Sequence, residues 1–170
     1  MNSPWCHLLK GLGTRLMSSG TAMLFLASCT AGVPSPMSGL DRWVNHSGSS
    51  RSPALAGQWL AFIASRGGRE EVVLVDVENL TRIPLTGLNR PDAHPLSVSV
   101  DQGGNRLVVV RRIDGRTELV LYRRNLRSLD SIPMAPAGVP GLASISADGQ
   151  EIAVQVSRGG LWQTDLIRLP

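Results

Sequence analysis

The sequence predicts an all-β protein in which a unit of four short antiparallel strands recurs about three times. The strongest evidence is a segment that begins at a Gly and continues as an apolar run, found at residues 57–63, 104–110 and 149–155. A glycine-bearing turn follows each copy, at residues 67–68, 114–115 and 159–160. Because such residues tolerate a positive φ angle, these turns favour hairpins, and a second strand is expected after each of them.

Residues 1–28 have the order of parts of an export signal. Lys10 and Arg15 form a positive segment without acidic residues, and residues 16–26 are mostly apolar but too short to span a bilayer. Small residues then precede a cysteine. The sequence Leu26-Ala27-Ser28-Cys29 resembles a lipobox, the site at which bacteria attach lipid to a cysteine and cleave in front of it.

Cys29 is therefore the predicted lipidation site and the first residue of the mature chain. Cys6 would leave with the signal, so one thiol would remain and no internal disulfide would form. The expected location is the cell envelope, on a membrane and facing the periplasm. The outer membrane is favoured because Thr30, and not Asp, follows the cysteine. The alternatives are an ordinary signal peptide with a Cys at its cleavage site, or a soluble protein with a buried Cys.

A flexible tether is expected at residues 29–53, before a repeat domain at 54–170. Stretches 33–39 and 47–53 are rich in Ser, Gly and Pro, and they bury too little apolar surface to offset the entropy of ordering. Between them, residues 40–45 carry a Trp and two aliphatic side chains. We interpret these residues either as a sticky patch in a linker or as a short strand that docks on the domain.

The other strands of the unit also recur. They are expected at 72–76 and 118–122, at 82–85 and 131–134, and, before the next Gly, at 97–101 and 144–148. Pro84 and Pro133 place the third strand at a sheet edge, because Pro lacks an N–H group. Four strands in a repeat of roughly 40–50 residues are typical of a β-propeller blade. An antiparallel sandwich or meander is the alternative.

One copy of the repeat has a specific motif. The sequence Ser146-Ala147-Asp148-Gly149, continued by Gln-Glu-Ile-Ala-Val, resembles the S-P-D-G-x-x-I-A-F core of TolB-type, WD40-like propeller repeats. Residues 101–109 form a looser copy with one inserted residue, and residues 53–57 form a still looser copy without the Asp. This resemblance covers about residues 53–170. It implies a propeller-like fold in an exported protein that serves as a binding platform, and it carries over no catalytic residue.

The predicted blades do not close a ring. Two units are nearly complete, whereas the third, from Gly141 to Pro170, ends after its third strand at 163–168. Because a closed ring needs about four blades or more, an incomplete ring with exposed strand edges is expected. Two completions stay open. Residues 40–45 supply the missing outer strand of the third blade, or two chains form a six-bladed ring as a homodimer.

No enzyme, metal or cofactor is expected. Lipid would consume Cys29, there is no G-x-S-x-G motif, and the Gly pairs lie between strands with no P-loop Lys after them. Asp92 and His94 share the segment 89–95, but two ligands from one loop make a weak metal site. We interpret this segment as a polar loop between blades.

Arginines crowd the second predicted blade: Arg111, Arg112, Arg116, Arg123, Arg124 and Arg127. On adjacent strands several of them would share a face and attract a carboxylate-rich partner or lipid head groups. Ordinary solvated charge, balanced by nearby acidic residues, is the alternative. Nucleic acid is not an expected partner, because removal of Lys10 and Arg15 lowers the net charge from +4 to about +2 and the chain has only two Phe and one Tyr.

These features predict a lipid-anchored cell-envelope binding or scaffold protein. Its expected partners are a membrane, through the lipid on Cys29, and an envelope protein or other acidic partner. The candidate partner-binding residues are the six arginines, Asp92 and His94. The alternatives are an accessory or sensor subunit of an envelope hydrolase, and a metal-dependent enzyme with a site near Asp92 and His94.

Overall fold

The computed structural model describes residues 34–46 and 48–170. The helix and strands described below all belong to one unit, Pro36–Pro170. The predicted signal peptide and Cys29 lie outside the described residues. Within the described part, no helix has both the length and the apolar character that crossing a membrane requires.

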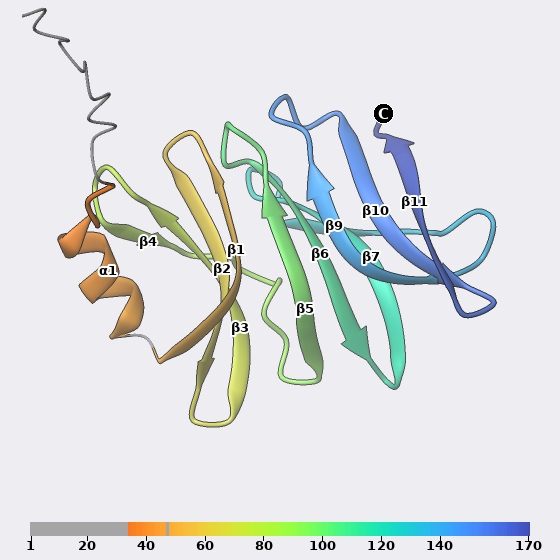
Figure 1. Ribbon diagram of the computed structural model, residues 1–170, viewed down its shortest axis with the longest axis horizontal. Coiled ribbons are helices and arrows are strands. Elements are labelled where there is room, and N and C mark those ends of the chain that lie inside the picture. Colours follow the sequence, from red (N-terminus) through yellow and green to blue (C-terminus); the bar gives the residue numbers. More distant parts are fainter. Residues whose placement is uncertain (1–33, 47) are drawn as a thin grey trace, which may run out of the picture. The chain divides into compact units, whose positions relative to one another are not determined.

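Three antiparallel sheets follow one another along this unit, which Figure 1 shows. The first sheet has the order β1(Ser49–Ala56)-β2(Trp59–Arg66)-β3(Arg69–Asp76)-β4(Thr81–Ile83). The second has the order β5(Ala93–Val100)-β6(Arg106–Ile113)-β7(Arg116–Arg123)-β8(Ser128–Ile132). The third has the order β9(Val139–Ile145)-β10(Glu151–Arg158)-β11(Leu161–Arg168). Each sheet is a meander, so the all-β prediction is confirmed.

The repeat is confirmed strand by strand. The turns at 67–68 and 159–160 connect consecutive strands of a sheet, and all four of their glycines have positive φ angles. The third sheet ends with β11 and has three strands instead of four, as the sequence predicted. The three sheets do not close into a ring, which confirms the incomplete propeller.

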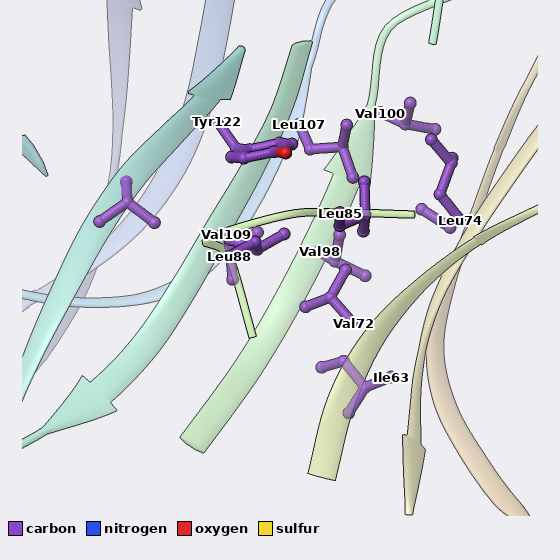
Figure 2. Close-up of a cluster of buried hydrophobic side chains, with 12 residues drawn as sticks. Ile63, Val72, Leu74, Leu85, Leu88, Val98, Val100, Leu107, Val109 and Tyr122 are labelled. Atoms are coloured by element: carbon purple, nitrogen blue, oxygen red, sulfur yellow. The ribbon is translucent and has the colours of Figure 1, made fainter. Parts of the chain in front are cut away.

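Apolar side chains fill the space between neighbouring sheets. The cluster between the first and second sheets contains Val72 and Leu74 of β3 and Val109 and Tyr122 of the second sheet, and Figure 2 shows these side chains facing one another. Tyr122 is 1% exposed, and its hydroxyl donates a hydrogen bond to the carbonyl oxygen of Thr86 at 2.9 Å. Burial of this polar group is therefore compensated.

A second cluster joins the second sheet to the third. It contains Val108, Val110, Leu119 and Leu121 of the second sheet and Ile145, Ile152, Val154 and Val156 of the third. β6 and β7 therefore bury both of their faces at residues 107–110 and 119–122, which explains the continuous apolar runs there.

The first strands of the sheets contact one another through serine side chains. Ser52 Oγ accepts a hydrogen bond from the N–H of Val98, and Ser97 Oγ accepts one from the N–H of Ala143, both at 3.3 Å and both 46 residues apart. β1, β5 and β9 each have a register shift in their pairing with the next strand, at Arg51/Ala54, Pro95/Ser97 and Pro140/Ala143. The repeat thus includes the contacts between sheets as well as the strands themselves.

The prediction of a strand at residues 40–45 is wrong. The helix α1(Ser38–Asn45) occupies this position, because Leu40 and Val44 are four residues apart and lie on one face of a helical turn. Both side chains pack against the outer cluster of the first sheet, which includes Phe62 and Val75. The segment therefore covers the first sheet and does not supply the fourth strand of the third.

The folded unit begins earlier than the predicted boundary at residue 54. Both α1 and the first half of β1 fall within residues 29–53, which the composition assigned to a tether. Ser49–Arg51 of β1 pair with β2 although the segment is rich in Ser. Arg51 also donates hydrogen bonds to both carboxylate oxygens of Glu70, at 3.0 and 2.9 Å, and to the carbonyl oxygens of Pro95 and Leu96. These tertiary contacts order a stretch whose composition favours a coil.

Candidate interaction surface

The outer face of the third sheet, which points away from the second sheet, is uncovered in the described part of the chain. Ile152, Val154 and Val156 of β10 point toward the second sheet and are buried, so the alternate residues of β10 point outward. On β11, Trp162 and Leu166 share this outer face and are 58% and 81% exposed. Exposed apolar side chains that gather on one face mark a contact surface.

Equivalent positions of the second sheet are buried. The repeat aligns Val108, Val110, Leu119 and Leu121 with Ala153, Gln155, Thr164 and Leu166. The first four residues pack against the third sheet, whereas the last four face outward. Two of the four positions, Gln155 and Thr164, are therefore polar where the second sheet has apolar residues. This face is therefore less apolar than the equivalent buried face of the second sheet.

Trp162 lies across the outer face toward β9. A Cβ atom on Gly141 would stand 2.8 Å from the six-membered ring of Trp162, so the absence of a side chain at Gly141 leaves room for the indole. Leu142, the next residue of β9, is 60% exposed. Trp162, Leu142 and Leu166 therefore form the apolar part of this surface, which we call the open face.

The free edge of β11 borders the open face. In the second sheet the equivalent strand β7 pairs with β8, with Leu119 opposite Ile132 and Leu121 opposite Asp130. β11 has no such partner among the described residues. A groove of about 470 Å³ runs beside it, lined by Pro133, Ala135 and residues 164–167. An unpaired edge with a groove beside it can accept a further strand.

Ionic contacts hold the inner side of β11 in place. Arg158 Nη1 donates hydrogen bonds to Asp165 Oδ1 at 2.9 Å and to Gln163 Oε1 at 3.1 Å. Arg158 Nη2 also donates to the carbonyl oxygen of Pro136 at 2.9 Å, which ties the connection between β8 and β9 to the third sheet. The hydrogen bond from Arg158 lowers the pKa of Asp165 below its ordinary value, against the opposing effect of burial. These contacts tie β11 to β10 and to the connection between β8 and β9.

The candidate residues Asp92 and His94 have different surroundings in the structure. Asp92 is bound by Arg90, whose Nη2 lies 2.6 Å from Asp92 Oδ2, and this hydrogen bond lowers the pKa of Asp92. His94 lies in β5, opposite Arg112, and not in the loop that the sequence predicted. The structure contains no group of three or more His, Cys, Asp or Glu side chains near enough to share a metal ion, within the described residues.

The six candidate arginines fall into two groups. Arg111, Arg112 and Arg116 lie near the β6–β7 hairpin, whereas Arg123, Arg124 and Arg127 lie at the opposite end of β7. β7 has eight residues, so about 20 Å separates the groups. A single positive patch over all six residues is therefore not formed.

Several of these arginines already have partners within the chain. Arg111 Nε lies 2.7 Å from Glu118 Oε1, and the Arg111 side chain is 8% exposed. Arg123 pairs with Asp130. Arg124 lies over the ring of Trp59, 4.8 Å from its centroid, and donates a hydrogen bond to Asn105 Oδ1. Arg112, Arg116 and Arg127 are exposed, and their binding of a partner stays a prediction.

Sequence reasoning missed the open face. The available signal was the loss of apolar character at Gln155 and Thr164, relative to Val110 and Leu119 in the aligned repeat. The significance of that loss depends on knowing which strand face points toward the next sheet. Only the structure supplies this direction, because both faces of a propeller blade are buried when another blade follows.

Comparison with known proteins supports the fold. No protein-family model matches the sequence, and no curated protein matches it. Among solved structures, TolB from Acinetobacter baumannii superposes with a TM-score of 0.54 at 18% identity, covering 69% of this chain and 29% of TolB. The β-propeller domain of Swd1 from Myceliophteria thermophila gives a TM-score of 0.39 at 14% identity, with 70% of this chain and 39% of that chain covered. Dihydro-heme d1 dehydrogenase NirN gives a TM-score of 0.39 at 19% identity, with 70% of this chain and 28% of that chain covered.

The match to TolB shows that the three sheets have a TolB-like propeller fold, as the repeat motif predicted. This chain spans less than a third of the length of that TolB structure.

Proposed function

We propose that this chain is a lipid-anchored protein of the bacterial cell envelope whose open face binds another protein. The observation that carries the proposal is the exposed apolar group on the third sheet. Leu142, Trp162 and Leu166 are each more than half exposed, at positions next to a free strand edge. Because burying apolar surface contributes about 25 cal/mol per Å², this face gains free energy when a partner covers it.

The other end of the row of sheets is already covered. Leu40 and Val44 of α1 pack on the outer cluster of the first sheet, so that face is not free for a partner while α1 stays docked. The open face and the β11 edge are therefore the preferred contact surface. The lipid on Cys29 is the proposed anchor, supported by the lipobox-like sequence of residues 26–29.

The anchor is tested by expressing the full chain in a bacterial host and measuring its intact mass after membrane extraction with detergent. The expected result is a chain that begins at Cys29 and carries acyl groups. The variant Cys29→Ala should lose the acyl mass and the cleavage in front of residue 29. A chain that begins at Met1 and has no added mass would contradict the proposed location.

The binding surface is tested by photo-cross-linking in intact cells. A photoreactive phenylalanine analogue at Gln155, on the open face, should give a discrete protein adduct. The same analogue at Leu126, which is 70% exposed in the turn after β7, serves as the matched control and should give none. Equal adducts from both positions would show that the open face is not a specific contact surface.

A further inference from the structure

We propose that the partner at the third sheet is a second copy of this chain, paired antiparallel through β11 about a two-fold axis at Thr164. The inference rests on the proposed function, because it names the partner of the same surface. The contact joins two three-stranded sheets into one of six strands. It differs from a six-bladed ring, in which the open face would meet the first sheet of another chain.

Backbone geometry determines which residues of β11 can pair. The N–H of Leu169 donates to the carbonyl oxygen of Gln150 at 2.7 Å, on the β10 side. Because backbone groups alternate along an antiparallel strand, the odd-numbered residues of β11 bond toward β10. Trp162, Thr164 and Leu166 therefore direct their N–H and C=O groups toward the free edge. These are the groups that a second strand must meet.

Of the symmetric registers centred on residues 163, 164 and 165, the one centred on Thr164 is favoured. Centring the pair on Thr164 places Thr164 opposite itself and Trp162 opposite the second copy's Leu166. Centring it on Asp165 would place two carboxylates directly opposite each other, which is destabilising. Centring it on Gln163 would leave Leu166 beyond the start of the facing strand, because β11 begins at Leu161.

The favoured register is complementary on both faces. On the outer face, each Trp162 stands opposite the Leu166 of the other copy, and pairing covers part of two apolar side chains that are 58% and 81% exposed. On the inner face, Gln163 lies opposite Asp165, whose charge Arg158 already balances. No like charges face each other across the pair. The groove beside residues 164–167 gives room for the inner side chains of the incoming strand.

This arrangement also removes the free edge without disturbing α1. A ring built from two chains would bring the open face against a first sheet whose outer cluster already holds Leu40 and Val44. Pairing through β11 uses no surface that is covered in the chain itself. A two-fold contact is closed, so it leaves no further β11 edge on which a third copy could add.

The closing experiment uses the full-length chain extracted in detergent. In the variant Thr164→Cys, the two new cysteines would lie in a hydrogen-bonded pair with Cα atoms about 5.5 Å apart, which suits a disulfide. The matched control is Thr81→Cys on β4, an exposed position on another outer strand. The parent chain, which has no cysteine at position 164 or 81, sets the background. We expect a disulfide-linked dimer from Thr164→Cys alone.

A second variant tests the same contact without cysteine chemistry. Leu166→Lys should weaken self-association about tenfold or more, because each dimer loses two Trp–Leu pairs. Leu126→Lys, at a similarly exposed position in the turn after β7, should leave it unchanged. Equal disulfide yields from positions 164 and 81, or a dimer that survives Leu166→Lys in the folded protein, would overturn the inference.

The outcomes also separate this inference from the proposed function. A Gln155 adduct to a different envelope protein, with no dimer through position 164, would remove the second copy as partner and keep the envelope-binding role. A dimer through position 164 in a chain that carries no lipid would support the contact and remove the proposed anchor.

Discussion

The indole ring of Trp59 lies directly against Gly104, where the first sheet meets the second. A Cβ atom on Gly104 would stand 2.4 Å from Trp59 Cδ2, and the φ angle of Gly104 is +65°. The guanidinium of Arg124 covers the ring at 4.8 Å from its centroid. Gly104 therefore has two roles. It adopts a left-handed backbone conformation in the turn before β6, and it leaves the space that the indole occupies.

This relationship predicts a large effect of Gly104→Ala. The matched control is Gly115→Ala, where φ is +74° but no atom lies within 4 Å of the added Cβ. The control should lose about 1–2 kcal/mol of stability from backbone strain alone. Gly104→Ala should lose about 3 kcal/mol or more, because the indole must also move. Urea unfolding of both variants measures the difference. Equal losses would show that the contact with Trp59 contributes nothing.

The strands that were predicted from the sequence are those in which the apolar side chains and the flanking turn residues favour the same structure. β2, β6 and β10 each follow a Gly with a positive φ angle. Each of them also carries apolar residues, because at least one face of the strand packs against another part of the protein. Local turn chemistry and burial favour the same structure there, so the repeat could be found without coordinates.

Residues 38–53 were harder to predict because tertiary contacts decide their structure. The four-residue spacing of Leu40 and Val44 indicates a helix only when an apolar surface is present to receive it, and that surface is Phe62 and Val75 of the first sheet. β1 is ordered by pairing with β2 and by Arg51, whose partners are 19 to 45 residues away in the sequence. Composition alone contains no information about such partners.

The candidate site was predicted less well than the fold. Asp92, His94 and six arginines were predicted as partner-binding residues, because charged residues can be located in a sequence without knowledge of their neighbours in the fold. The structure shows that Arg90 binds Asp92 and that Glu118 binds Arg111. The free edge of β11 was expected from the count of strands. The direction of the open face required the packing of β10 against the second sheet.

Docking of α1 is tested by Val44→Asp. The substitution places a charge against the outer cluster of the first sheet, so α1 should leave the surface at a cost of about 1–3 kcal/mol. Trypsin cleaves after Arg42, which lies within α1, and this cleavage should become faster in the variant. Leu126→Asp, an exposed change outside α1, should cleave after Arg42 at the parent rate. Unchanged cleavage in Val44→Asp would mean that the helix does not depend on this contact.

The Arg158–Asp165 pair predicts a dependence of stability on pH. Because the hydrogen bond from Arg158 lowers the folded-state pKa of Asp165, the unfolded chain binds more protons between that pKa and the ordinary value near 3.9. The stabilisation is present above the ordinary value and is lost as the pH falls through the lowered one. The free energy of unfolding of Asp165→Asn should therefore decrease less than that of the parent between about pH 5 and pH 3.

Urea midpoints across this range measure the effect. Arg158→Gln should flatten the curve as well, and the double variant should add little to either single change, because both remove one interaction. Other carboxyl groups with a lowered pKa, such as Asp76 and Asp148, keep part of the acid sensitivity in every variant. Parallel curves for the parent and Asp165→Asn would exclude a contribution from this pair.

The polar positions of the open face predict a change in solubility. Gln155 occupies the place of Val110 in the repeat and points away from the second sheet. Gln155→Val would join the apolar group of Trp162 and Leu166, so the exposed apolar patch becomes larger while the buried core is unchanged. We expect stability within about 0.5 kcal/mol of the parent, as is usual for surface changes, but stronger self-association. Light scattering over a concentration series measures this, with Gln102→Val as an exposed control outside the third sheet. If Gln155→Val and Gln102→Val associate equally, the polar side chain at position 155 does not limit contact at the open face.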